Sequence, residues 1–147
     1  MTKAIRKRLA GDEGFTLIEL MVVVMIIAVL IAIAIPSFLG FRRSAQDRAA
    51  QSDVRSVLLV EKAIWLEDNA YTADEGRISD FEPNVQFLDA TNPQGVSVTM
   101  TGDDVCIERL SASGTIFGVW ESATLGTYYG EGNCPADPTA TWVATGW

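Results

Sequence analysis

The stretch Gly14-Phe15-Thr16-Leu17-Ile18-Glu19 opens a long apolar segment and decides the fold of this chain. Every residue from Leu20 to Ile35 is apolar, and Glu19 is the only charged residue between Phe15 and Phe41. A helix of this length crosses a hydrocarbon core of about 30 Å, so we predict a membrane-spanning helix over residues 15–41. An acid in such a helix costs roughly 2.5–3.5 kcal/mol on insertion scales and usually has a partner or a function. Glu19 is therefore a candidate functional residue.

The residues before this segment carry a basic cluster that predicts the topology. Lys3, Arg6, Lys7 and Arg8 precede the apolar run. Because positively charged flanks stay in the cytoplasm, we expect a single-pass precursor with a cytoplasmic N-terminus and everything from Arg42 onward on the other side.

The Gly14-Phe15 junction, the acid four residues after Phe15 and Pro36 within the apolar run occur together. In these features the chain resembles the type IV pilin family, over Gly14 to about Phe41. The resemblance implies a leader at residues 1–14, cleavage between Gly14 and Phe15 by a prepilin peptidase, and N-methylation of Phe15.

Two other interpretations of the segment compete with this one. An ordinary secretory signal peptide would use Ala32-Ile33-Ala34 as its small-x-small cleavage site, but Glu19 and the length of the apolar run argue against it. A plain signal anchor explains the basic head and the apolar run, but it treats the Gly-Phe junction and the position of Glu19 as coincidences.

Beyond the membrane segment, residues 42–68 keep a helical pattern among charged residues. Val54, Val57, Leu58 and Trp65 recur at helical spacing and predict the amphipathic half of one long helix. Pro36 removes a backbone donor and Gly40 weakens the helix one turn later, so we expect a kink or local melting between about Ala32 and Gly40. In the family this region similarly loosens when subunits pack into a filament.

Residues 69–147 are predicted to form one small globular head, which makes the fold class α+β. We expect an irregular connector from Tyr71 to Pro93, anchored by Phe81, Val85, Phe87 and Leu88. Three antiparallel strands follow in the prediction, at Val96–Met100, Val105–Leu110 and Ile116–Trp120. They would lay Val96, Val98, Met100 and Phe117 against the apolar face of the helix. The tail from Tyr128 to Trp147 is expected to be irregular.

The head is strongly acidic, because residues 69–147 hold eleven acids against Arg77 and Arg109. Such a surface repels phosphate backbones, so we expect no direct nucleic-acid binding by a single subunit. Cys106 and Cys134 both lie in the part placed outside the membrane, where disulfides persist, and their pairing is the natural interpretation. A disulfide in the C-terminal part of the head is also what the family resemblance implies.

The sequence contains no evident catalytic constellation. Histidine is absent, and no Ser or Cys nucleophile has a base nearby in the sequence, so we expect no enzyme, no cofactor and no metal. Calcium binding by Asp103 and Asp104 with Glu131 or Asp137 is a weaker alternative to an acidic surface turn. The aromatic residues Tyr128, Tyr129, Trp142 and Trp147 either fill the core or form an adhesive or subunit-contact surface.

The resemblance implies a mechanism of assembly. After cleavage, the new amine at Phe15 would meet the Glu19 carboxylate of a neighbouring subunit and set the axial register of a helical homo-oligomer. Ala28 and Ala32, one helical turn apart, would let neighbouring helices approach closely. The implied machinery includes an assembly ATPase and a platform protein, and the mature chain would reside in a cell-surface pilus. The uses implied are adhesion, motility or DNA uptake.

Two other functions remain open from the sequence. A pseudopilin of type II secretion shares the N-terminal signature and differs in the head. A membrane-anchored extracytoplasmic binding protein that never polymerises belongs to a different class, and it would keep its leader.

Overall fold

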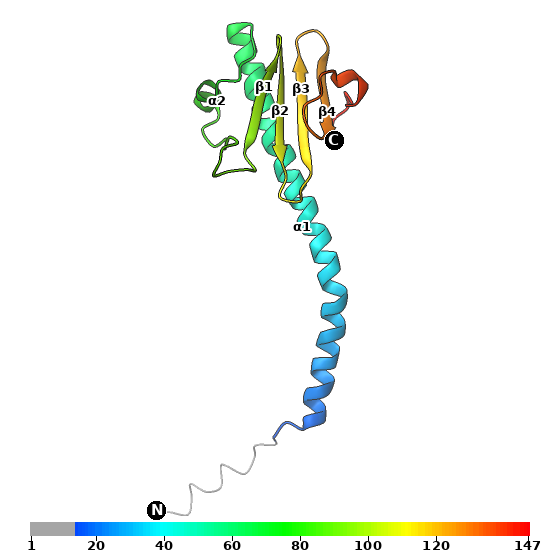
Figure 1. Ribbon diagram of the computed structural model, residues 1–147. Helices are drawn as coiled ribbons and strands as arrows, with labels where there is room; N and C mark the ends of the chain where they lie inside the picture. Colours follow the sequence, from blue (N-terminus) through cyan, green and yellow to red (C-terminus); the bar gives the residue numbers. More distant parts are fainter. Residues whose placement is uncertain (1–13) are drawn as a thin grey trace, which may run out of the picture. The chain divides into compact units, whose positions relative to one another are not determined.

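A computed structural model describes residues 14–147 of the chain (Figure 1). The leader expected at residues 1–14 lies outside the described residues apart from Gly14. The chain divides into two compact units between Gly40 and Phe41, and each unit is described by itself. Helix α1, Leu17–Asp68, contributes to both units.

In the first unit, α1 is helical throughout residues 17–40, with Pro36 inside it. Local melting between Ala32 and Gly40, one of the two predicted distortions, is therefore wrong for this structure, and the alternative, a kink, stays a prediction. Ser37 Oγ donates a hydrogen bond to the Ile33 carbonyl oxygen at 3.4 Å, which supplies one side-chain contact within the turn around the proline. Loosening of this segment inside a filament stays a prediction.

The second unit places a four-stranded antiparallel sheet against the remainder of α1 (Figure 1). The strands are β1, Val96–Thr101, β2, Asp104–Leu110, β3, Ile116–Ser122, and β4, Gly126–Glu131, and they pair in chain order. The predicted α+β class and the first three strands are confirmed, each strand extending by one or two residues beyond its predicted bounds.

The register of the sheet decides which side chains face α1. Val98, Ile107, Val119 and Tyr129 stand opposite one another across the four strands. They pack on the face of α1 that carries Val57. The buried members of this core are Val54, Val57, Leu58, Val60, Ile64, Tyr71, Ile78, Val96, Val105, Ile107 and Val119. Of the residues predicted to face the helix, Met100 is 38% exposed, and it lies on edge strand β1 two residues before Gly102 of the turn to β2.

Strand β4 corrects the prediction of an irregular tail and of only three strands. Along β4, Thr127 and Tyr129 alternate with Tyr128 and Gly130. Because glycine has no side chain, the sequence shows no alternation of polar and apolar residues here. Gly118 and Gly130 stand opposite each other in β3 and β4, and the Trp142 indole lies over both. A Cβ at Gly130 would lie 2.1 Å from the indole, so this close approach requires glycine.

A short helix, α2, Glu75–Phe81, corrects the second part of the prediction, which gave an irregular connector. Asp74 caps it by accepting a hydrogen bond from the Gly76 amide at 2.9 Å. Within the same connector, Val85 and Phe87 pack against the core as predicted, whereas Phe81 and Leu88 are 36% and 49% exposed and lie outside it. After β4, a 3₁₀ turn at Pro138–Ala140 leads the chain back over the outer face of the sheet.

Candidate assembly site

The start of α1 is built as a capping box around Thr16 and Glu19. The Thr16 amide and the Thr16 hydroxyl both donate to Glu19 Oε2, at 2.9 and 2.7 Å, and the Glu19 amide donates to Thr16 Oγ1 at 3.3 Å. These reciprocal bonds satisfy backbone donors that a helix N-terminus otherwise leaves unpaired. Thr16 is thus a structural partner of Glu19 that we did not predict, although the Thr-x-x-Glu spacing is a recognised signal.

Glu19 keeps one carboxylate oxygen available despite this cap. Both bonds from Thr16 use Oε2, and among the described residues no hydrogen bond to Oε1 is found. Phe15, Ile18, Val22 and Val23 surround the carboxylate on one face of the helix. A second donor that reaches this face would meet a charged acceptor within an apolar surrounding.

The apolar half of α1 buries none of its side chains in this chain. The large hydrophobic residues from Phe15 to Phe41 are each at least 47% exposed. Among the described residues, α1 is the helix whose length and composition suffice to cross a membrane. Ala28 and Ala32 lie exposed on it. A surface of this kind needs a lipid environment or other helices to cover it.

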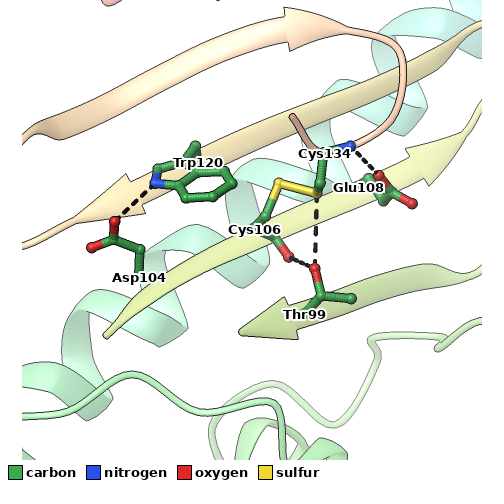
Figure 2. The surroundings of a disulfide bond; sticks show 6 residues. All are labelled: Thr99, Asp104, Cys106, Glu108, Trp120 and Cys134. Atoms are coloured by element: carbon green, nitrogen blue, oxygen red, sulfur yellow. Dashed lines mark hydrogen bonds between the residues drawn. A yellow bond between two sulfur atoms is a disulfide. The ribbon is translucent and has the colours of Figure 1, made fainter. Parts of the chain in front are cut away.

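The predicted disulfide between Cys106 and Cys134 is present, and it ties the chain after β4 to the outer face of β2 (Figure 2). The Cys134 amide donates to Glu108 Oε2 at 2.8 Å. Cys106 is fully buried beside Trp120 and Trp142 in a second, smaller core. The disulfide therefore covers the sheet on the side away from α1.

The aromatic residues of the tail fill the head. Trp142 is 7% exposed. Trp147 stacks edge-on against Phe117 and Tyr129, with ring centroids 5.8 and 5.1 Å apart, and the Arg55 guanidinium lies 5.1 Å from its ring centroid. These contacts support core filling over an adhesive aromatic surface.

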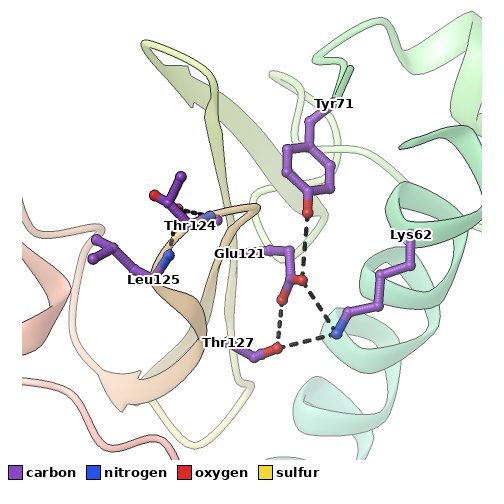
Figure 3. Close-up of polar contacts among 7 residues, drawn as sticks. Lys62, Tyr71, Glu121, Thr124, Leu125 and Thr127 are labelled. Carbon is purple, nitrogen blue, oxygen red and sulfur yellow. Dashed lines mark hydrogen bonds and ion pairs between the residues drawn. The ribbon is translucent and has the colours of Figure 1, made fainter. Parts of the chain in front are cut away.

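A polar cluster around the buried Glu121 joins α1 to strands β3 and β4 (Figure 3). Glu121 in β3 pairs with Lys62 of α1 at 3.2 Å and accepts from Thr127 at 2.5 Å and from the Tyr71 hydroxyl at 3.4 Å. Burial and the nearby Glu121 charge raise the pKa of Tyr71 to about 12, so its hydroxyl stays a donor. We did not predict this cluster, because its four members come from separate segments.

Glu61 is the second buried acid that we did not predict. It is fully buried on the core face of α1, where Oε2 accepts from the Thr72 amide at 3.0 Å and Oε1 has no hydrogen-bond partner. Burial raises the pKa of Glu61 to about 7, against the partial opposition of the Thr72 bond. The signal was its position between Val57 and Ile64, inside the apolar stripe.

The acids named for the weaker calcium alternative have other contacts in the structure. The Asp104 carboxylate accepts from the Trp120 indole at 3.3 Å, and Asp137 caps the 3₁₀ turn. Within residues 14–147, no group of three acidic, histidine or cysteine side chains is placed to hold a metal ion.

Comparisons with known proteins find sequences that are similar to this chain. The family model described as "Prokaryotic N-terminal methylation motif" matches residues 10–35. The chain is 38% identical over 94 residues to the type IV major pilin protein PilA of Myxococcus xanthus, covering 63% of this chain and 40% of that protein. It is 28% identical over 115 residues to the type IV wide pilus major component PilA4 of Thermus thermophilus, covering 76% and 81%.

A third relative is the type II secretion system core protein G of Pectobacterium carotovorum, 36% identical over 64 residues, which are 44% of this chain and 41% of that protein. The chain thus spans less than half of the length of two of these three relatives.

The capped Glu19, the exposed apolar helix and the disulfide-closed sheet define a class: proteins with a prepilin methylation motif and one N-terminal helix. Within this class, the chain is similar to type IV pilins. The motif, the helix and the pilin relatives support a membrane-anchored precursor and a surface pilus as its locations.

Proposed function

We propose that the chain is a structural, non-enzymatic subunit of a type IV pilus. A prepilin peptidase cleaves between Gly14 and Phe15, Phe15 is N-methylated, and the N-terminal helix drives polymerisation into a surface filament. The observation that carries this proposal is the exposure of at least 47% at every large hydrophobic residue from Phe15 to Phe41. Lipid covers this surface in the precursor, and the helices of other subunits cover it in the filament.

Glu19 sets the axial register in this proposal. Its Oε1 accepts from the Phe15 amine of a neighbouring subunit, while Oε2 keeps the bonds from Thr16. Charge attraction in an apolar bundle favours this pair and desolvation opposes it, so the pair selects position more than it adds stability. Ala28 and Ala32 allow neighbouring helices to approach closely, and Pro36 lets the helix loosen during packing.

The pilin and pseudopilin relatives imply that pilus-type machinery assembles the filament. We propose a platform protein and an assembly ATPase as its specific components, and adhesion, motility or DNA uptake as the use of the filament.

The test is to replace Glu19 by Ala and, as an isosteric neutral control, by Gln, and to quantify filaments sheared from the cell surface. We expect at least tenfold fewer filaments in both variants, with the head still folded and its disulfide closed. Normal piliation by Glu19→Ala would contradict the mechanism.

A pseudopilin of type II secretion is the second candidate, and the match to core protein G favours it. Loss of protein secretion upon deletion, without loss of surface filaments, would support it. If only full-length monomers are found in the membrane, the chain is instead an anchored binding protein.

A further inference from the structure

The second unit carries opposite charges at its two ends. Between residues 42 and 48, Arg42, Arg43 and Arg48 are exposed, and the ion pairs found in the described chain involve none of them. The one acid in this stretch, Asp47, accepts hydrogen bonds from Ser111 and Ser113. We call these three arginines the basic collar.

The opposite end of the same unit is acidic. Residues 67–82 hold six carboxylates and a single base, Arg77. Arg77 pairs with Glu67 at 2.7 Å and with Asp68 at 3.2 Å, so its charge is already matched. Three exposed carboxylates around α2 remain without a cation among the described residues, and they form what we call the acidic crown: Asp74, Glu75 and Asp80.

The collar and the crown form no ion pair with each other within the described chain. The Arg77 bonds to Glu67 and Asp68 hold α2 beside the C-terminal end of α1 (Figure 1). Arg48 precedes Asp68 by twenty residues of α1, which is roughly 30 Å at 1.5 Å per residue. An arginine side chain spans only a fraction of this distance, so the collar does not reach the end of α1 beside which Arg77 holds α2, and it is free to meet the crown of another copy.

We propose that the basic collar of one subunit docks on the acidic crown of another subunit of the same chain. The two surfaces are different, so the contact is heterologous, and repeated heterologous contacts build open helical filaments. This inference rests on the proposed function and deepens it, because it adds a second register-setting contact outside the apolar helix. Charge complementarity selects the partner and suppresses wrong registers.

The test uses charge reversal in the full chain, produced in the organism that makes it. The collar variant is R42E/R43E, the crown variant is E75R/D80R, and the combined variant carries all four changes. A matched control, D103R/E131R, changes the charge of two exposed acids on other parts of the head by the same amount as the crown variant. Membrane accumulation and a closed disulfide are checked in each variant.

We expect at least tenfold fewer surface filaments in the collar and crown variants, recovery to within about threefold of wild type in the combined variant, and no more than a twofold change in the control. Normal assembly of either reversal variant overturns the contact. Loss in the collar variant that the combined variant does not recover indicates lipid headgroups as the partner and also overturns it. Absence of filaments from the wild-type chain overturns the proposed function instead.

A crosslinking experiment covers variants that fail to accumulate. Arg48→Cys and Asp80→Cys are combined in one chain and treated with a short thiol crosslinker in intact cells. A head-to-tail contact yields a ladder of multimers from the double variant and at most dimers from either single variant, because each chain then bonds to two others. A double variant that gives no ladder contradicts the contact.

Discussion

The two halves of α1 are both rich in aliphatic residues, but only one half is buried by its own chain. Val54, Val57 and Ile64 are at most 1% exposed beneath the sheet, whereas Val24 and Leu30 are 54% and 61% exposed. In the first set apolar residues recur at helical spacing among polar ones, and in the second set they are continuous. Periodic apolar residues match a partner on one side, while a continuous run demands partners all round. One half of the helix is therefore covered by the head, and the other half needs a cover that its own chain does not supply, which we propose is other subunits.

The largest expected effect comes from placing a charge in each half. Val57→Asp buries an unpaired carboxylate beneath the sheet and should cost about 3–5 kcal/mol of head stability. Leu59→Asp, two residues away and 68% exposed, is the matched control and should change stability by less than about 1 kcal/mol. Val24→Asp should leave the head unchanged and block assembly. Thermal unfolding in detergent measures the stability of the head in all three variants. A destabilised head in Val24→Asp would contradict the division of α1 into two halves.

A second prediction concerns the core on the far side of the sheet. Gly130→Ala should destabilise the head by about 2–3 kcal/mol, because its Cβ would overlap the Trp142 indole. In a Trp142→Ala background the same substitution should cost less than about 1 kcal/mol, since the obstacle is gone. Urea titration of the four chains gives the coupling free energy, and equal costs in both backgrounds would show that Trp142 is not the reason for the glycine.

Buried Glu61 predicts a pH dependence that belongs to the head-bearing half of α1 alone. Its pKa is raised by folding from 4.5 to about 7, so the folded state holds the proton more tightly than the unfolded state. The free energy of unfolding should therefore fall as pH rises through this window, by roughly 2–3 kcal/mol between pH 5 and pH 8. Glu61→Gln should remove this part of the slope, while Glu75→Gln, on exposed α2, should keep it. Identical slopes for wild type and Glu61→Gln would refute the assignment.

The smallest effect is expected at the start of the apolar half. Thr16→Val removes the hydroxyl of the capping box, and the first turn of α1 should fray, with amide exchange about three- to tenfold faster over residues 17–20. Thr16→Ser keeps the hydroxyl and should behave as wild type. Exchange measured in detergent micelles tests this, and an unchanged rate in Thr16→Val would mean that the cap adds no order.

Much of the fold follows from local patterns in the sequence. The apolar run, the helical spacing around Val57 and the alternation in β1 each predicted an element that the structure contains. The failures have physical causes: α2 is too short to show a period, and β4 has glycine at the position where Trp142 needs space.

The site was predictable to a different degree. Glu19 stands out in the sequence, because an isolated acid in an apolar run requires an explanation. Glu121 does not stand out, because its partners Lys62 and Tyr71 come from distant segments and only tertiary packing brings them together. Glu61 lies between: its place in the apolar stripe is visible, but its unpaired oxygen is not.

The most direct test of the central claim is the intact mass and N-terminal sequence of protein sheared from the cell surface. If the exposed half of α1 exists for assembly, the sheared protein begins at N-methylated Phe15 and is lighter than its reduced form by the hydrogens lost in closing the disulfide. Finding only the full chain, Met1 to Trp147, confined to the membrane would contradict the claim.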